Sequence, residues 1–207
     1  GTMMIAHGLQ LQVMGIRSVI ENFNVITTGI FMSGYYIGYF VGSKTTPQLV
    51  SKVGHIRVFA AFASLASLSA LVAVAYVNPF MWTISRFITG ISLVSCYIVS
   101  ESWLNDRATN KNRGQLLSTY MIVIYFGLSI GMLLLNVSNP RNYEPFILVS
   151  VLLSLALVPI LLTKRSAPKF KKIGTMSVIE LYNISPLGSV SSFCTGIIHG
   201  GFFSLIA

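Results

Sequence analysis

Long apolar runs, each close to the length of a membrane-spanning helix, recur through this 207-residue sequence. An α-helix needs about 20 predominantly apolar residues to cross the hydrocarbon core of a bilayer. We place seven such runs at 1–16, 25–43, 58–77, 80–102, 116–136, 146–163 and 187–207. They are too long and too uniformly apolar for the short alternating strands of a membrane barrel. The sequence therefore predicts an all-α integral membrane protein.

The composition agrees with a chain that has a lipid bilayer as its main partner. Hydrophobic residues make up 54% of the chain and charged residues only 9%, whereas a soluble domain carries about 25% charged residues. The net charge of +9 would suit nucleic acid, but the 14 Lys and Arg lie in short clusters between apolar runs, so we expect no nucleic-acid partner. Cys96 and Cys194 lie inside apolar runs, which indicates packing rather than a disulfide or a metal site. We expect neither a metal nor another cofactor.

The basic residues alternate between the connections in a way that predicts topology. Two residues, Arg17 and Arg141, belong to one set of alternate connections, and Arg86 lies within a run. The other set holds eleven Lys and Arg, namely Lys44, Lys52, Arg57, Arg107, Lys111, Arg113, Lys164, Arg165, Lys169, Lys171 and Lys172. Cytoplasmic loops of membrane proteins carry an excess of Lys and Arg. We therefore expect a multi-pass protein of the inner membrane whose basic loops are cytoplasmic.

Glycines recur at four-residue spacing within two of the runs. Gly34, Gly38 and Gly42 form two overlapping G-x-x-x-G steps, and Gly127 and Gly131 form another. Small residues at this spacing let helix backbones approach closely in a membrane. We interpret these glycines, with Gly90 in the fourth run, as helix-packing positions.

The fourth run carries the sequence's clearest candidate for a functional site. Arg86, Gly90, Tyr97 and Glu101 fall within about 60° of one another on a helix of 3.6 residues per turn. Polar groups inside a membrane are costly, so we expect this stripe to face the protein interior or a water-filled cavity. The alternative is that Arg86 reaches the outer interface and Glu101 marks the cytoplasmic end of the helix.

Two other runs contain groups that could bind a polar substrate or a coupling proton. His7 and Gln10 share a face of the first run, and His199 lies in the last. Hydrogen bonds between helices would explain the same residues equally well. Aromatic candidates for substrate contact lie in the second run, at Tyr35, Tyr36 and Tyr39.

Several motifs resemble those of the major facilitator superfamily. The loop after the family's second helix has the form G-x-x-x-D-R-x-G-R-R, and the stretch 47–57 keeps Gly54, Lys52 and Arg57 but has Ser51 at the acidic position. The family's fourth helix has R-x-x-x-G, which Arg86 and Gly90 match, and an Arg-Gly pair opening the fifth helix is matched at 113–114. The resemblance implies a gating loop that includes Lys52, Gly54, Arg57, Arg107 and Arg113.

Three stretches also resemble the bacterial YcaD-like branch of this superfamily, at 49–57, 101–105 and 185–188. The family has twelve helices in two halves. The resemblance therefore implies a fragment with an N-terminal six-helix bundle at 1–163, its first helix truncated. A basic cytoplasmic linker at 164–185 and the first helix of the second bundle at 186–207 would follow. The C-terminal half would be missing from this chain.

From these features we expect a secondary transporter that moves a small solute by alternating access, coupled to H⁺ or another ion. A G-x-x-x-x-G-K-[ST] phosphate loop is absent from the sequence, so a primary pump would need another subunit. The main alternative is a seven-helix receptor or sensor, although the last run has no Lys for a retinal Schiff base. An enzyme is not expected, because five acidic residues leave little general acid–base capacity.

Overall fold

The computed structural model describes residues 1–162 and 177–206, which are helices joined by short turns and contain no strand. This confirms the predicted all-α class for the described residues. The chain divides into two compact units, Gly1–Phe170 and Lys171–Ala207. The first unit contains α1 (Thr2–Ile20), α2 (Val25–Val53), α3 (His55–Ala75), α4 (Pro79–Arg107), α5 (Arg113–Leu134), a short 3₁₀ turn η1 (Leu135–Val137), α6 (Glu144–Leu155) and α7 (Val158–Leu161).

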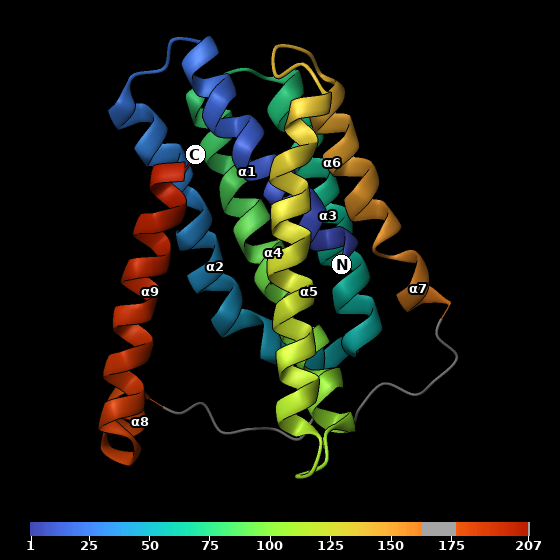
Figure 1. Ribbon diagram of the computed structural model, residues 1–207, viewed down its shortest axis with the longest axis vertical. Coiled ribbons are helices and arrows are strands. Elements are labelled where there is room, and N and C mark those ends of the chain that lie inside the picture. Colours follow the sequence, from blue (N-terminus) through green and yellow to red (C-terminus); the bar gives the residue numbers. More distant parts are fainter. Residues whose placement is uncertain (163–176, 207) are drawn as a thin grey trace. The chain divides into compact units, whose positions relative to one another are not determined.

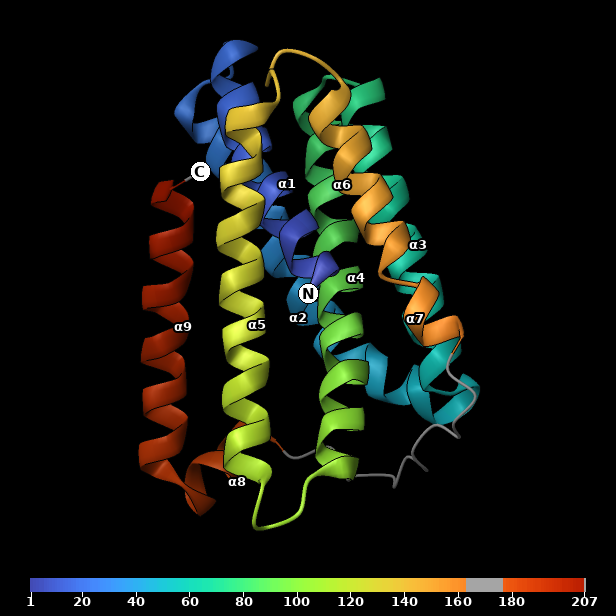
Figure 2. The same ribbon diagram turned by 45° about the vertical axis from the view of Figure 1, so that its right-hand side comes forward.

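The helices of the first unit form a bundle in which α4 is central (Figures 1 and 2). Helix α4 packs against α2 on one side and α3 on another, while α1 packs against α5 and α6. In both views Gly1 lies about half-way along the neighbouring helices, so α1 accompanies only part of their length. Side chains of α1 reach those of α2 and α4 across the interior, as in the contacts of His7 with Tyr35 and of Gln10 with Thr89.

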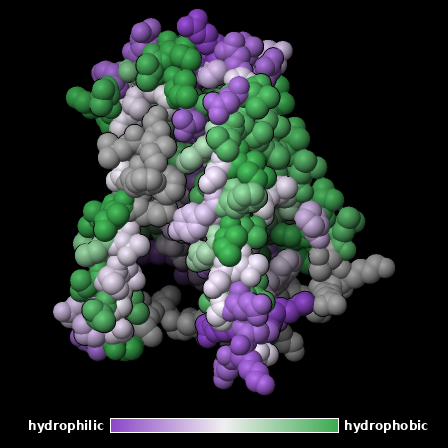
Figure 3. Space-filling view, viewed as in Figure 1, coloured by the Kyte–Doolittle hydropathy of each residue, from purple (hydrophilic) through white to green (hydrophobic). Residues whose placement is uncertain are grey.

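Successive turns of the first unit lie at alternate ends of the bundle. The α1–α2, α3–α4 and α5–α6 connections gather at one end, and the α2–α3 and α4–α5 connections gather at the other (Figures 1 and 2). Hydrophilic residues mark both ends of this unit, and a mostly hydrophobic band separates them (Figure 3). Such a band is expected where helices meet lipid tails.

Five described helical segments are long and apolar enough to cross a membrane: Val25–Val53, His55–Ala75, Pro79–Arg107, Arg113–Val137 and Glu144–Leu161. Seven spans were expected. Helix α1 falls outside this set because His7, Gln10, Gln12 and Arg17 dilute its apolar character. In the second unit, the stretch Pro186–Ile198 is apolar but shorter.

Two helices run further than their apolar runs predict. Helix α2 continues from residue 43 through Pro47 to Val53, and α4 continues from 102 to Arg107. The added turns carry exposed residues such as Lys52 and Arg107. An apolar run marks only the part of a helix that would contact lipid, whereas the backbone hydrogen bonds of the helix can continue into water. Residues expected to form loops therefore belong to helix ends.

The sixth predicted run is interrupted rather than continuous. Helix α6 ends at Leu155, and a separate turn of helix, α7, follows with Pro159 near its start. Proline lacks the N–H that would bond back to the preceding turn, and its ring crowds that turn. The break was therefore readable from the sequence.

The second unit contains α8 (Val178–Ile184) and α9 (Pro186–Ile206). Helix α8 begins with a capping box in which Ser177 and Glu180 satisfy each other's backbone N–H groups. It lies in the stretch 164–185 that we expected to be a linker, and residues 164–176 of that stretch lie outside the described residues. The Ser-x-x-Glu spacing is a recognised start signal for a helix.

Candidate functional site

Arg86 lies in the interior of the first unit, about two turns from the start of α4. Its side chain is only 2% exposed. The guanidinium carbon lies 4.9 Å from the ring centroid of Tyr35 on α2, within the range of a cation–π contact. Its Nε and Nη1 atoms are buried and have no hydrogen-bond partner. The structure thus places a charged group inside the bundle with donors that remain unpaired.

The ring of Tyr35 connects Arg86 to α1. It stacks on the imidazole of His7, with ring centroids 5.3 Å apart and an interplanar angle of 20°. The Nδ1 atom of His7 is also buried without a hydrogen-bond partner. On its own helix, Tyr35 contacts the rings of Tyr36 and Tyr39. We call Arg86, Tyr35 and His7 the Arg86 cluster.

Gln10, one turn after His7, has a different environment. It is 1% exposed, and its Nε2 donates to the hydroxyl of Thr89 on α4 at 3.3 Å. The Thr89 hydroxyl in turn lies 2.9 Å from the hydroxyl of Ser69 on α3 and donates to the Ser85 carbonyl at 2.9 Å. These bonds join α1, α3 and α4 through paired polar groups. Gln10 therefore acts as an interhelical hydrogen-bonding residue in this structure.

The predicted stripe on α4 passes from the interior to the surface. Tyr97 is partly buried, and its hydroxyl donates to the sulfur of Met4 on α1 at 3.0 Å. Glu101 is exposed and accepts from the hydroxyl of Tyr120 on α5 at 3.5 Å. At 1.5 Å per residue, Arg86 and Glu101 are about 22 Å apart along the helix axis. The structure does not bring the cation and the carboxylate of the stripe together.

The helix-packing glycines do meet neighbouring backbones closely. A Cβ on Gly38 would overlap the Phe87 carbonyl of α4, and one on Gly90 would overlap the Tyr35 carbonyl of α2. Gly34 faces Thr83 and Arg86, and Gly42 faces Ile91 and Val94. On the other side of the bundle, Gly127 and Gly131 face α1 at Met4 and Ile5. The close α2–α4 approach that places Tyr35 beside Arg86 therefore requires small residues.

The predicted gating residues lie at the end that holds the α2–α3 and α4–α5 turns. Gly54 alone separates α2 from α3, with φ +90° and ψ 160°. The side chains of Lys52, Arg57, Arg107 and Arg113 are exposed. Arg113 donates to the side-chain oxygen of Asn105 at 3.3 Å, which connects the start of α5 to the end of α4.

A contact at this end was not predicted from the sequence. The Nε2 of His55, directly after Gly54, lies 3.0 Å from the hydroxyl of Ser102 on α4. The His55 ring also stacks near Trp103, with ring centroids 6.5 Å apart. His55 and Ser102 fall in two of the stretches that resemble the YcaD-like branch. Both stretches stand out in the sequence, but no sequence pattern indicates that they touch.

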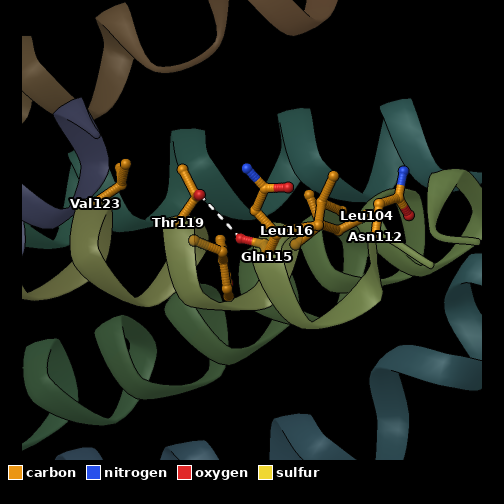
Figure 4. A pocket seen from close by; sticks show the side chains of 7 residues that line it. Leu104, Asn112, Gln115, Leu116, Thr119 and Val123 are labelled. Carbon is orange, nitrogen blue, oxygen red and sulfur yellow. Dashed lines mark hydrogen bonds between the residues drawn. The ribbon is translucent and has the colours of Figure 1, made fainter. Parts of the chain in front are cut away.

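A pocket of about 420 Å³ lies away from the Arg86 cluster, at the junction of α4 and α5. Figure 4 shows that Asn112, Gln115 and Thr119 present polar atoms there. The remaining lining comes from Leu104, Leu116, Tyr120 and Val123. Of these residues, Tyr120 donates a hydrogen bond to a predicted site residue, Glu101.

The remaining predictions concern metals and His199. Among the described residues, no group of three or more His, Cys, Asp or Glu could hold a metal ion. Residue 199 belongs to α9, but the structure does not describe its side chain. A role for His199 therefore stays a prediction.

Comparison with known proteins extends the sequence resemblance. The chain is 25% identical over 180 residues to an uncharacterized MFS-type transporter YcaD of Escherichia fergusonii, covering 86% of this chain and 47% of that protein. It is 26% identical over 188 residues to the YcaD of Escherichia coli O6:K15:H31, covering 90% of this chain and 49% of that protein. The chain thus spans about half the length of the curated relatives it matches. No solved structure matches it.

A family model gives the broader relationship. The model described as Major Facilitator Superfamily matches residues 2–207, which is nearly the whole chain. This match gives no support to the alternative of a seven-helix receptor. The extent of the match shows that this chain belongs to the Major Facilitator Superfamily of membrane transporters.

Proposed function

We propose that this chain is the N-terminal part of a secondary active transporter that moves a small solute across the inner membrane. In this proposal residues 1–163 form one helix bundle, and residues 186–207 begin a second. The solute crosses by alternating access, as the two bundles rock about a site near the middle of the membrane. The match to about half the length of the YcaD proteins supports this division.

The observation that carries the proposal is the buried position of Arg86. An ionisable residue within a membrane helix is expensive and usually serves transport or a polar network. Arg86 is almost wholly enclosed. Its guanidinium lies over the Tyr35 ring of α2, and that ring stacks on His7 of α1. A purely structural helix gains nothing from an arginine with unpaired donors.

We assign H⁺ as the coupling ion of this transporter. The described residues contain no acidic cluster of the kind that holds a metal cation, and the Arg86 cluster contains an imidazole. An imidazole can bind and release a proton at its ring nitrogens. His7 is therefore the proposed residue for proton coupling within this part of the chain.

Uptake into vesicles tests the function directly. The complete protein is reconstituted in liposomes, and labelled small solutes are offered while a pH gradient is imposed. The proposal expects at least one solute to accumulate above its external concentration, and a protonophore to abolish that accumulation. Accumulation that follows a Na⁺ gradient instead would overturn H⁺ as the coupling ion. Failure of every imposed gradient to drive any solute would overturn secondary transport.

A further inference from the structure

We propose that Arg86 binds the carboxylate group of the transported substrate, so that the protein carries small organic monocarboxylates. This inference rests on the proposed function and adds the substrate class. A guanidinium cannot escape the cost of burial by releasing its proton. It therefore needs an anion or several acceptors nearby.

The chain itself offers no anion to Arg86. All five of its acidic side chains lie among the described residues. Glu21 pairs with Arg17 at 2.7 Å, and Glu180 caps α8. Glu101, Asp106 and Glu144 are exposed, two of them far along α4 and the third at the start of α6. Arg17–Glu21 is the one ion pair that the described residues contain. The charge of Arg86 is thus uncompensated within this chain.

The unpaired donors show where a bound anion would sit. Nε and Nη1 of Arg86 are buried and lack acceptors, and Nδ1 of His7 lacks a partner as well. Both side chains contact the same Tyr35 ring, from α4 and from α1. A carboxylate in this cluster would accept hydrogen bonds from the guanidinium, and an N–H at His7 Nδ1 would supply another donor. Charge-assisted hydrogen bonds of this kind are among the strongest in proteins.

The surroundings favour an organic monoanion over other anions. The single positive charge of Arg86 balances the single negative charge of a carboxylate, whereas a phosphate dianion would leave one negative charge unbalanced. The ring of Tyr35 contacts the rings of Tyr36 and Tyr39. These two side chains are 43% and 38% exposed and present aromatic surface beside the cluster. Such rings cover the apolar part of an organic acid and give nothing specific to chloride. Because Tyr35 encloses Arg86 in this structure, its ring must move for the substrate to enter.

Ligand-induced stabilisation of the purified complete protein tests the inference. The probes are benzoate, its uncharged isostere benzamide, chloride and phosphate, each titrated while the thermal unfolding midpoint is followed. We expect benzoate to raise the midpoint and the other three to leave it unchanged. The variant Arg86→Gln should weaken benzoate binding about 30-fold or more, as expected for loss of a buried charge partner. The control Arg141→Gln, which removes an exposed cation, should bind benzoate as the wild type does.

The stability of the empty variant separates this inference from a structural role. Removing an uncompensated buried charge should leave the unfolding midpoint of Arg86→Gln equal to or above that of the wild type. If a carboxylate elsewhere in the complete protein already neutralises Arg86, the midpoint should fall instead, and the inference is wrong. Stabilisation by benzamide or chloride equal to that by benzoate would also overturn it. Gradient-driven uptake of neutral solutes alone would refute the substrate class while leaving the proposed transport function intact.

Discussion

The guanidinium of Arg86 on α4 lies over the ring of Tyr35 on α2, 4.9 Å from its centroid. This contact depends on the glycines around it, because Gly34 and Gly90 remove the Cβ atoms that would hold the two backbones apart. The same ring stacks on His7 of α1. One aromatic side chain therefore joins the three helices that enclose the buried charge.

The α2–α4 interface gives a first prediction. Gly38→Ala should lower the stability of the protein by about 1–3 kcal/mol, because the added methyl would overlap the Phe87 carbonyl. Gly29→Ala is the matched control, since a Cβ there meets nothing within 4 Å and lies on the same helix. Thermal unfolding of both variants in detergent makes the comparison. Equal midpoints for the two would show that α2 and α4 are not in close contact at Gly38.

The turn between α2 and α3 gives a second prediction. Gly54 has φ +90°, a conformation that side chains other than glycine rarely adopt, and a Cβ there would meet open space. Gly54→Ala should therefore cost about 1–3 kcal/mol through backbone strain alone. It should also impair transport more than membrane insertion. Gly114→Ala, in the first turn of α5 and equally uncrowded, is the control. Wild-type uptake and stability in Gly54→Ala would make this turn a mere connector.

The contact between His55 and Ser102 gives a third prediction. Their 3.0 Å hydrogen bond joins the start of α3 to the end of α4. A double-mutant cycle with His55→Ala and Ser102→Ala should show a coupling of about 1 kcal/mol in unfolding free energy. Additive effects of the two single variants would contradict a direct bond between these side chains.

Membrane topology gives a fourth prediction. Lys52 and Lys111 lie in or beside turns at one end of the bundle, and Asn78 and Asn142 lie at the other (Figures 1 and 2). Single cysteines at the two lysine positions should react only from the cytoplasm, and those at the two asparagine positions only from outside. Labelling of positions 52 and 111 from opposite sides would contradict the arrangement of the helices.

The sequence predicts the positions of the helices well, because a helix that crosses the hydrocarbon core of a membrane needs a long run of apolar residues. It does not predict that α2 runs on to Val53, since hydropathy carries no information about a helix beyond the lipid. It places His7 and Gln10 on one face, but only the structure separates the unpaired imidazole from the amide bonded to Thr89.

Contacts between distant segments were the least predictable part of the candidate site. Helical spacing predicted a common face for Arg86 and Glu101, yet 15 residues of helix keep them about 22 Å apart. Tyr35 was one of three similar tyrosines in its run, and nothing local distinguishes it. Tyr35 lies beside Arg86 because of the register in which α2 packs against α4. That register depends on glycines in the interface and is known only once the two helices are packed.

The most direct test of the account is gradient-driven uptake by Arg86→Ala in the complete protein, measured beside its abundance in the membrane. We expect accumulation to fall at least tenfold, to background, while insertion stays nearly normal. Arg86→Lys should recover only part of the activity, because an ammonium lacks the planar set of guanidinium donors. Normal accumulation by Arg86→Ala at normal abundance would contradict the central role given to this residue.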